Sequence, residues 1–149
     1  MPPLIKVYEA LGALGDGRVR EAGGGGAEVV SSDRSKTYRV EVSADGREVS
    51  SNDNASYWQG YLGYPGIAVL LARGFLNARN ETIRALSGIP WKQINRRFRN
   101  DYARATAEVA RIVAERGGDF AKIRAEAESI LGALRELGPR RGVRRRPAQ

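Results

Sequence analysis

The residues of this chain that could bind a ligand form two groups, and the first group is basic. On a helix that would start at Pro90, Lys92, Arg96 and Arg99 lie within about 60° of one another and have no acidic neighbour three or four positions away. Guanidinium and ammonium groups bind phosphates, and phosphate neutralisation supplies most of the non-specific affinity for nucleic acid. We expect other arginines to contribute as well, namely Arg79, Arg140, Arg141, Arg144, Arg145 and Arg146.

The charge pattern around this basic group allows two interpretations. The formal net charge is +8, from 25 basic and 17 acidic residues. The group could bind a polyanion, or it could be solvated or pair with carboxylates from elsewhere in the fold. No helix-turn-helix, KH or RRM pattern accompanies it, so nothing indicates sequence-specific recognition. Six other charges on the same stretch alternate in sign at helical spacing and predict a salt-bridge ladder: Arg97, Asp101, Arg104, Glu108, Arg111 and Glu115.

The second group is an aromatic and polar segment between the expected strands and the later helices. Its rings could stack on unpaired bases, or they could form the walls of a small-molecule pocket. They could also pack in the core while the polar residues make turns. Asp53 is the acid in this segment whose pKa we expect to be perturbed. The candidate residues are Asn52, Asp53, Asn54, Tyr57, Trp58, Tyr61 and Tyr64.

The absence of histidine and cysteine excludes several kinds of chemistry. Zinc sites, cysteine nucleophiles and Ser-His-Asp triads all need one of these residues. Gly12, Gly15 and Gly17 are in the wrong order for a dinucleotide-binding fingerprint, and residues 23–26 lack the Lys-Ser/Thr pair of a phosphate loop. Residues 52–54 do not have the spacing of a calcium loop. We therefore expect a non-catalytic protein with no metal and no cofactor.

The elements that must position these groups follow from the periodicity of apolar residues. Residues 4–14 have helical spacing behind two prolines, and four alternating stretches at 18–22, 27–31, 37–43 and 47–51 are typical of short antiparallel strands. Asp45-Gly46 predicts a tight turn between the last two strands. The helices expected in the second half cover residues 65–73, 80–88, 90–116 and 119–137.

These elements predict an α+β domain over residues 1–138. It would contain an N-terminal helix, a small antiparallel meander of three to four strands, and a helical half that ends in a long antiparallel helix hairpin. Residues 139–149 contain five arginines and few apolar residues, which predicts a disordered tail. The chain shows neither a signal peptide nor an apolar run near the roughly 20 residues of a membrane span, so we expect a cytoplasmic protein without membrane contact.

The functional hypothesis that these patterns favour is a basic accessory protein that binds nucleic acid, RNA rather than DNA, through backbone contacts. Two alternatives stay open. A protein-interaction domain would be favoured by a large exposed apolar patch. A small-ligand-binding protein or an enzyme centred on residues 51–64 would be favoured by a deep pocket with Asp53 at its floor.

Overall fold

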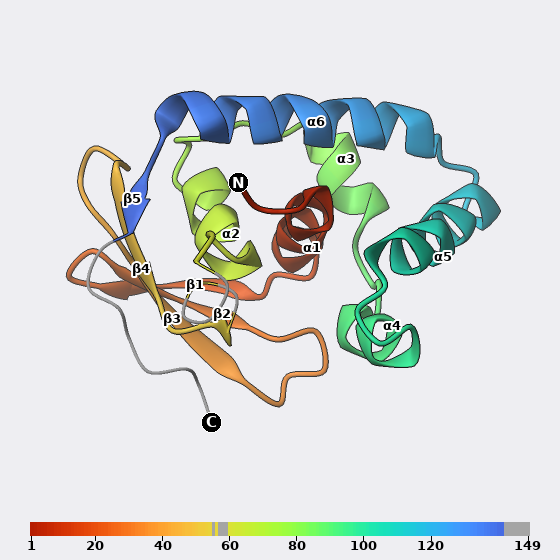
Figure 1. Ribbon diagram of the computed structural model, residues 1–149, viewed down its shortest axis with the longest axis horizontal. Helices are drawn as coiled ribbons and strands as arrows, with labels where there is room; N and C mark the ends of the chain where they lie inside the picture. The colour runs from red at the N-terminus through yellow and green to blue at the C-terminus, as the bar shows by residue number, and fades with distance from the viewer. Residues whose placement is uncertain (55, 57–59, 142–149) are drawn as a thin grey trace.

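The computed structural model describes residues 1–54, 56 and 60–141 (Figure 1). It confirms the predicted α+β class, with an N-terminal helix, an antiparallel meander and a helical C-terminal half. The elements in chain order are α1 (Leu4–Gly15), β1 (Val19–Gly23), β2 (Gly26–Val30), β3 (Thr37–Val42), β4 (Glu48–Ser51), α2 (Tyr64–Ala72), α3 (Asn80–Ala85), α4 (Trp91–Arg97), α5 (Tyr102–Glu115), α6 (Phe120–Leu137) and β5 (Arg140–Arg141).

The sheet has the strand order β1-β2-β3-β4-β5, and its first four strands are antiparallel neighbours. Along β3 burial alternates, so Val40 and Val42 face the core while Arg39 and Glu41 face solvent. The turn predicted at Asp45-Gly46 is present, because Gly46 has φ +73° and its amide donates to the carbonyl of Ser43 at 2.9 Å.

Helices α1 and α2 form a middle layer between the sheet and α6 (Figure 1). In α1, eight of twelve residues are buried, and the Tyr8 ring lies 5.3 Å from the ring of Phe120 on α6. A helix that is apolar on nearly all sides is enclosed by its neighbours. The two charged residues of α1, Lys6 and Glu9, are therefore carried into the interior of the protein.

The prediction of one continuous helix over residues 90–116 is wrong, because the chain turns between α4 and α5. Arg99 and Asn100 adopt left-handed backbone conformations with φ of 52° and 61°. Asp101 then caps α5 by accepting a hydrogen bond from the amide of Arg104 at 3.2 Å. The apolar pattern did not reveal the break, since Phe98 and Tyr102 on its two sides both pack against the core.

The chain returns to the sheet after α6. Gly138, with φ +56°, ends that helix, and the amide of Arg140 donates to the carbonyl of Arg47 at 2.7 Å. Residues 140–141, which we placed in the tail, thus form β5 and pair in parallel with β4. Among the described residues, no helix combines the length and the apolar character needed to cross a bilayer.

Candidate functional site

A cavity of about 170 Å³ lies where α1, the β2–β3 loop, β3, the segment after β4, α2 and α4 meet. We call it the α1–α4 cavity. Charged and polar side chains from all of these segments line it together with the rings of Tyr38, Tyr64 and Trp91. Residues that are far apart in the sequence therefore meet around one small, partly open cavity.

Glu9 supplies the most deeply placed carboxyl group of this cavity. Its residue is 4% exposed, and the ammonium of Lys6 lies 3.4 Å from its Oε1 atom. Burial raises the pKa of Glu9, while the charge of Lys6, hydrogen bonds from Lys6 and Asn95, and the charge of Arg18 act in the opposite direction. The net direction is upward, because removing a carboxylate from water disfavours its charged form.

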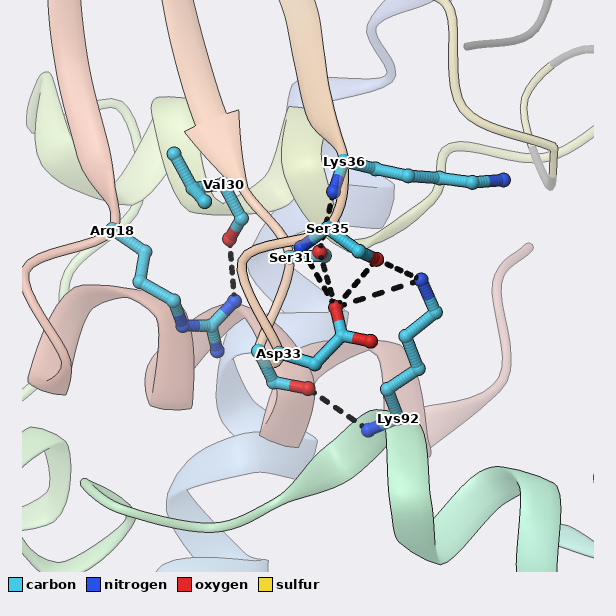
Figure 2. A network of polar contacts seen from close by, with 8 residues as sticks. Arg18, Val30, Ser31, Asp33, Ser35, Lys36 and Lys92 are labelled. Carbon is cyan, nitrogen blue, oxygen red and sulfur yellow. Dashed lines mark hydrogen bonds and ion pairs between the residues drawn. The ribbon is translucent and has the colours of Figure 1, made fainter. Parts of the chain in front are cut away.

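Arg18 contributes a buried guanidinium group, at 2% exposure, just before β1. Its Nη1 atom donates to the carbonyl of Val30 at 2.8 Å, as Figure 2 shows, and its Nε atom donates to Asp16 at 3.0 Å. Asp16 also accepts from the amide of Gly88 at 2.6 Å. These contacts fix the guanidinium in place and link the end of α1 to β2 and to the segment before α4.

The β2–β3 loop forms one wall of the cavity and is held around Asp33 (Figure 2). Its Oδ1 atom accepts hydrogen bonds from Ser31 and Ser35, and the bonds from Ser35 hold the pKa of Asp33 well below its usual range. Lys92 on α4 joins the loop through three contacts, from its amide to Ser32 at 2.9 Å and from its ammonium to Ser35 at 2.6 Å and Asp33 at 3.5 Å. The start of α4 is thereby attached to the sheet.

Asp53 lines the cavity as the sequence suggested, but its oxygens are already engaged. The carboxylate, in a residue that is 5% exposed, accepts from the hydroxyls of Ser51 at 2.5 Å and Ser56 at 2.8 Å and from the amide of Ser56 at 3.1 Å. Asp53 therefore holds the local turn, and Glu9 is the acid with a perturbed environment.

The aromatic segment is only partly brought into the cavity. Tyr64 lines it and packs edge-on against Tyr38, with ring centroids 6.1 Å apart, and burial raises the pKa of Tyr38 to about 12 and also raises that of Tyr64. Asn54 lies exposed at the edge of the cavity. Tyr61 is half-buried beside Tyr102 and outside the cavity lining.

One other candidate of the segment can be placed as well, and two cannot. Asn52 accepts a hydrogen bond from the amide of Arg39 at 2.8 Å, so it supports β3 and does not line the α1–α4 cavity. Tyr57 and Trp58, which we predicted as stacking or pocket residues, lie outside the described residues.

The basic group predicted on one helix face is divided in the structure. Lys92 is paired with Asp33, and Arg99 follows α4 in a left-handed turn. The expectation that Lys92, Arg96 and Arg99 share a helix face is therefore wrong for Arg99, because the helix ends before it. Arg96 and Arg99 are both exposed, and neither forms a salt bridge with a described residue.

The remaining predicted arginines belong to other segments of the chain. Arg79 precedes α3 and is exposed, and its amide donates to Glu126 at 2.5 Å. Arg140 is exposed in β5, and Arg141 follows it in the same strand. Arg144, Arg145 and Arg146 lie outside the described residues.

The predicted ladder of salt bridges is present in part. Glu108 pairs with Arg111 at 2.7 Å and with Arg97 at 4.0 Å, and Arg111 also pairs with Glu115 at 2.6 Å. Asp101 caps α5 instead of joining the ladder. Arg104 lies 4.9 Å from the centroid of the Phe98 ring.

Sequence reasoning missed Glu9, Arg18 and Asn95 as cavity residues. One observation could have found Glu9: it is the acidic residue of a helix whose other side chains, except Lys6, are apolar. A charge on a helix that is apolar all round must be buried and must have a partner. No sequence pattern indicated Arg18 or Asn95, because only the fold brings them to this cavity.

Two properties of the described residues bear on the alternatives. These residues contain no group of three or more acidic residues that could hold a metal ion. Among the large hydrophobic side chains that the structure describes, Met1 is the exposed one, at 59%. The described surface therefore lacks the apolar patch that would favour a protein-interaction domain.

Comparison with known proteins gives one match. A family model described as "Uncharacterised conserved protein UCP014422" matches residues 1–140, a range that includes every residue of the α1–α4 cavity. No curated protein and no solved structure matches the chain.

Proposed function

The chain belongs to the family of uncharacterised conserved proteins UCP014422, and we propose that it binds a small polar ligand in the α1–α4 cavity. The observation that carries this proposal is the presence of two nearly inaccessible charged side chains, Glu9 at 4% and Arg18 at 2% exposure, in the lining of an open space. Burying an ion costs several kcal/mol even after relaxation. Perturbed charged groups that face a cavity are typical of functional sites.

The dimensions of the cavity limit the size of the ligand. A volume of about 170 Å³ is close to that of an engineered protein cavity, about 150 Å³, that binds benzene. Tyr38, Tyr64 and Trp91 supply flat apolar walls, and the charged groups supply orientation. The proposed ligand is thus a compact molecule with at least one polar group.

A fragment screen with two matched variants tests this function. Fragments of about benzene size should raise the melting temperature of the wild type. Asn54→Trp places a large ring at the exposed edge of the cavity and should abolish the effect. Gln93→Trp makes the same change at an exposed position of α4 outside the cavity and should keep it. Hits that Asn54→Trp leaves unaffected would contradict the proposal.

Nucleic-acid binding is a second candidate, and one observation favours it. Arg96 and Arg99 are exposed at the end of α4 and have no salt-bridge partner among the described residues. Such guanidinium groups can bind phosphates bidentately. They would give a salt-dependent, sequence-independent interaction with a nucleic-acid backbone.

Charge reversal separates this candidate from general electrostatic attraction. The double variant Arg96→Glu and Arg99→Glu should lose binding to labelled single-stranded RNA at moderate salt. As a control, Arg111→Glu removes a guanidinium that is already paired with Glu108 and Glu115, and it should change the affinity less. If the double variant and Arg111→Glu lose the same RNA affinity per reversed charge, Arg96 and Arg99 do not form a specific contact surface.

A further inference from the structure

Among the described residues, five charged side chains line the α1–α4 cavity, and they differ in where their partners lie. Arg18 is bonded to Asp16, and Lys92 is bonded to Asp33, while both acids lie outside the lining. Asp53 is satisfied by Ser51 and Ser56. The remaining two, Lys6 and Glu9, have each other as salt-bridge partners.

We propose that the α1–α4 cavity, the site of the proposed function, takes a small anion, and that the anion enters together with one proton, which Glu9 accepts. In so small a space, the negative group of a ligand would lie within a few ångströms of the Glu9 carboxylate. Two like charges at that separation repel each other strongly. A proton on Glu9 removes the repulsion, and it frees the ammonium of Lys6 to become the counter-ion of the ligand.

The geometry around Glu9 offers a place for that proton. Asn95 on α4 hydrogen bonds to Glu9, and its Oδ1 atom is buried without a hydrogen-bond partner among the described residues. A protonated carboxyl group is a donor as well as an acceptor, so it can supply the hydrogen bond that this amide oxygen lacks. An ionised carboxylate cannot.

The surroundings of Glu9 act on its protonation in opposite directions, and an anion would shift their balance toward the protonated form. Burial already raises the pKa of Glu9, so protonation needs less free energy than in an exposed glutamate. The charge of Lys6 is the largest opposing influence, and an anion that neutralises Lys6 weakens it. The remaining groups that face this site are Arg18 from the turn after α1, Lys92 from α4, Tyr38 from β3, Tyr64 from α2, and Asp53 and Tyr61 from the segment after β4.

The test uses three probes of suitable size with the full-length protein. Benzoate carries a carboxylate, inorganic sulfate is an oxyanion that stays fully ionised over the pH range used, and benzamide has the shape of benzoate without its charge. Binding is measured by calorimetry between about pH 6 and pH 8, and proton uptake is measured in unbuffered solution with a pH-stat. Binding of benzoate alone, or of sulfate alone, identifies which kind of anion the site accepts.

We expect an anion to bind with uptake of close to one proton and to weaken by up to about tenfold per pH unit above the pKa of Glu9. Glu9→Gln, which mimics the protonated side chain, should bind without uptake and without this pH dependence. Glu128→Gln changes an exposed acid on α6 outside the cavity and should behave as the wild type.

The outcomes distinguish this inference from the function on which it rests. Binding of benzamide without binding of either anion would overturn the inference and leave a small-ligand site. Anion binding with no proton uptake by the wild type would also overturn the inference, whether or not Glu9→Gln folds. Failure of all three probes to bind would overturn both.

Discussion

Glu9 brings a carboxyl group into the interior of the protein on a helix that is almost entirely apolar. Its desolvation is only partly offset by Lys6 and Asn95, which leaves its pKa above the usual value. Asp53, equally inaccessible, accepts three hydrogen bonds and shows how a buried carboxylate is satisfied when it only supports a turn. The contrast between these two acids identifies Glu9 as the chemically distinctive residue of the cavity.

Glu9→Gln should alter how stability depends on pH. Because the pKa of Glu9 is raised in the folded state, the fold binds more protons than the unfolded chain between the two pKa values, and stability falls as pH rises through that window. Glutamine does not ionise, so the variant lacks this fall. Relative to the wild type it should gain about 1.4 kcal/mol for each pH unit between the two pKa values.

Urea unfolding at a series of pH values from about 4.5 upward measures this difference. Glu128→Gln, at an exposed position that pairs with Arg124, is the matched control and should follow the wild type. Parallel stability curves for Glu9→Gln and the wild type would show that burial does not perturb this carboxyl group.

The elements that build the cavity differ in how well the sequence predicts them. The helix at α1 and the four strands follow from local periodicity and from turn residues such as Asp45-Gly46. The break between α4 and α5 does not, because the apolar pattern continues through Phe98 and Tyr102 while Asn100 and Asp101 redirect the backbone. The turn preference of Asn100 and Asp101 therefore decided the local backbone conformation, although the apolar spacing predicted a continuous helix.

The packing of α4 on α1 requires a glycine at position 12. A Cβ atom placed there would lie 2.7 Å from Nε1 of Trp91, and this ring is buried at 3% exposure. Gly12→Ala should therefore destabilise the protein by about 1 to 2 kcal/mol, since the steric cost exceeds the gain in helix propensity. The displaced Trp91 ring is also a wall of the cavity, so ligand binding should weaken.

Gly132→Ala is the matched control for this packing argument. Gly132 lies within α6, and a Cβ atom there would meet nothing within 4 Å. The control should stabilise the protein by about 0.5 to 1 kcal/mol, because alanine is the better helix former. Chemical denaturation measures the change in the free energy of unfolding for each variant. Equal changes at the two positions would refute the close contact between α1 and α4.

The whole molecule is closed by contacts between its C-terminal part and the sheet. The amide of Arg140 donates to Arg47, and β5 extends the sheet beside β4, so the helical half is attached to the strands at both of its ends. The site could not be predicted at this scale, because Lys6, Arg18 and Asn95 meet only when α1, the sheet and α4 are packed together. Among the residues of this cavity, the sequence indicated Asp53, Asn54 and Tyr64 as pocket candidates, and it indicated Lys92 only as a candidate for binding nucleic acid.

A chain that ends at Arg141 should be more stable than one that ends at Gly138. The shorter chain lacks β5 and the hydrogen bond to Arg47, and a hydrogen bond of this kind contributes about 1 kcal/mol. The difference should appear in the midpoint of urea unfolding. Identical midpoints would mean that the pairing of β4 with β5 contributes nothing to stability.

The central claim is that the α1–α4 cavity is a binding site for a small polar ligand, and amide NMR tests it most directly. A titration of the ¹⁵N-labelled wild type with benzoate should shift the amides of cavity residues, above all Glu9, Arg18 and Asn95, and leave those around Glu126 on α6 unchanged. Such a pattern would locate the ligand in the cavity. Shifts spread over the surface, or shifts absent with benzoate, sulfate and benzamide alike, would contradict the claim.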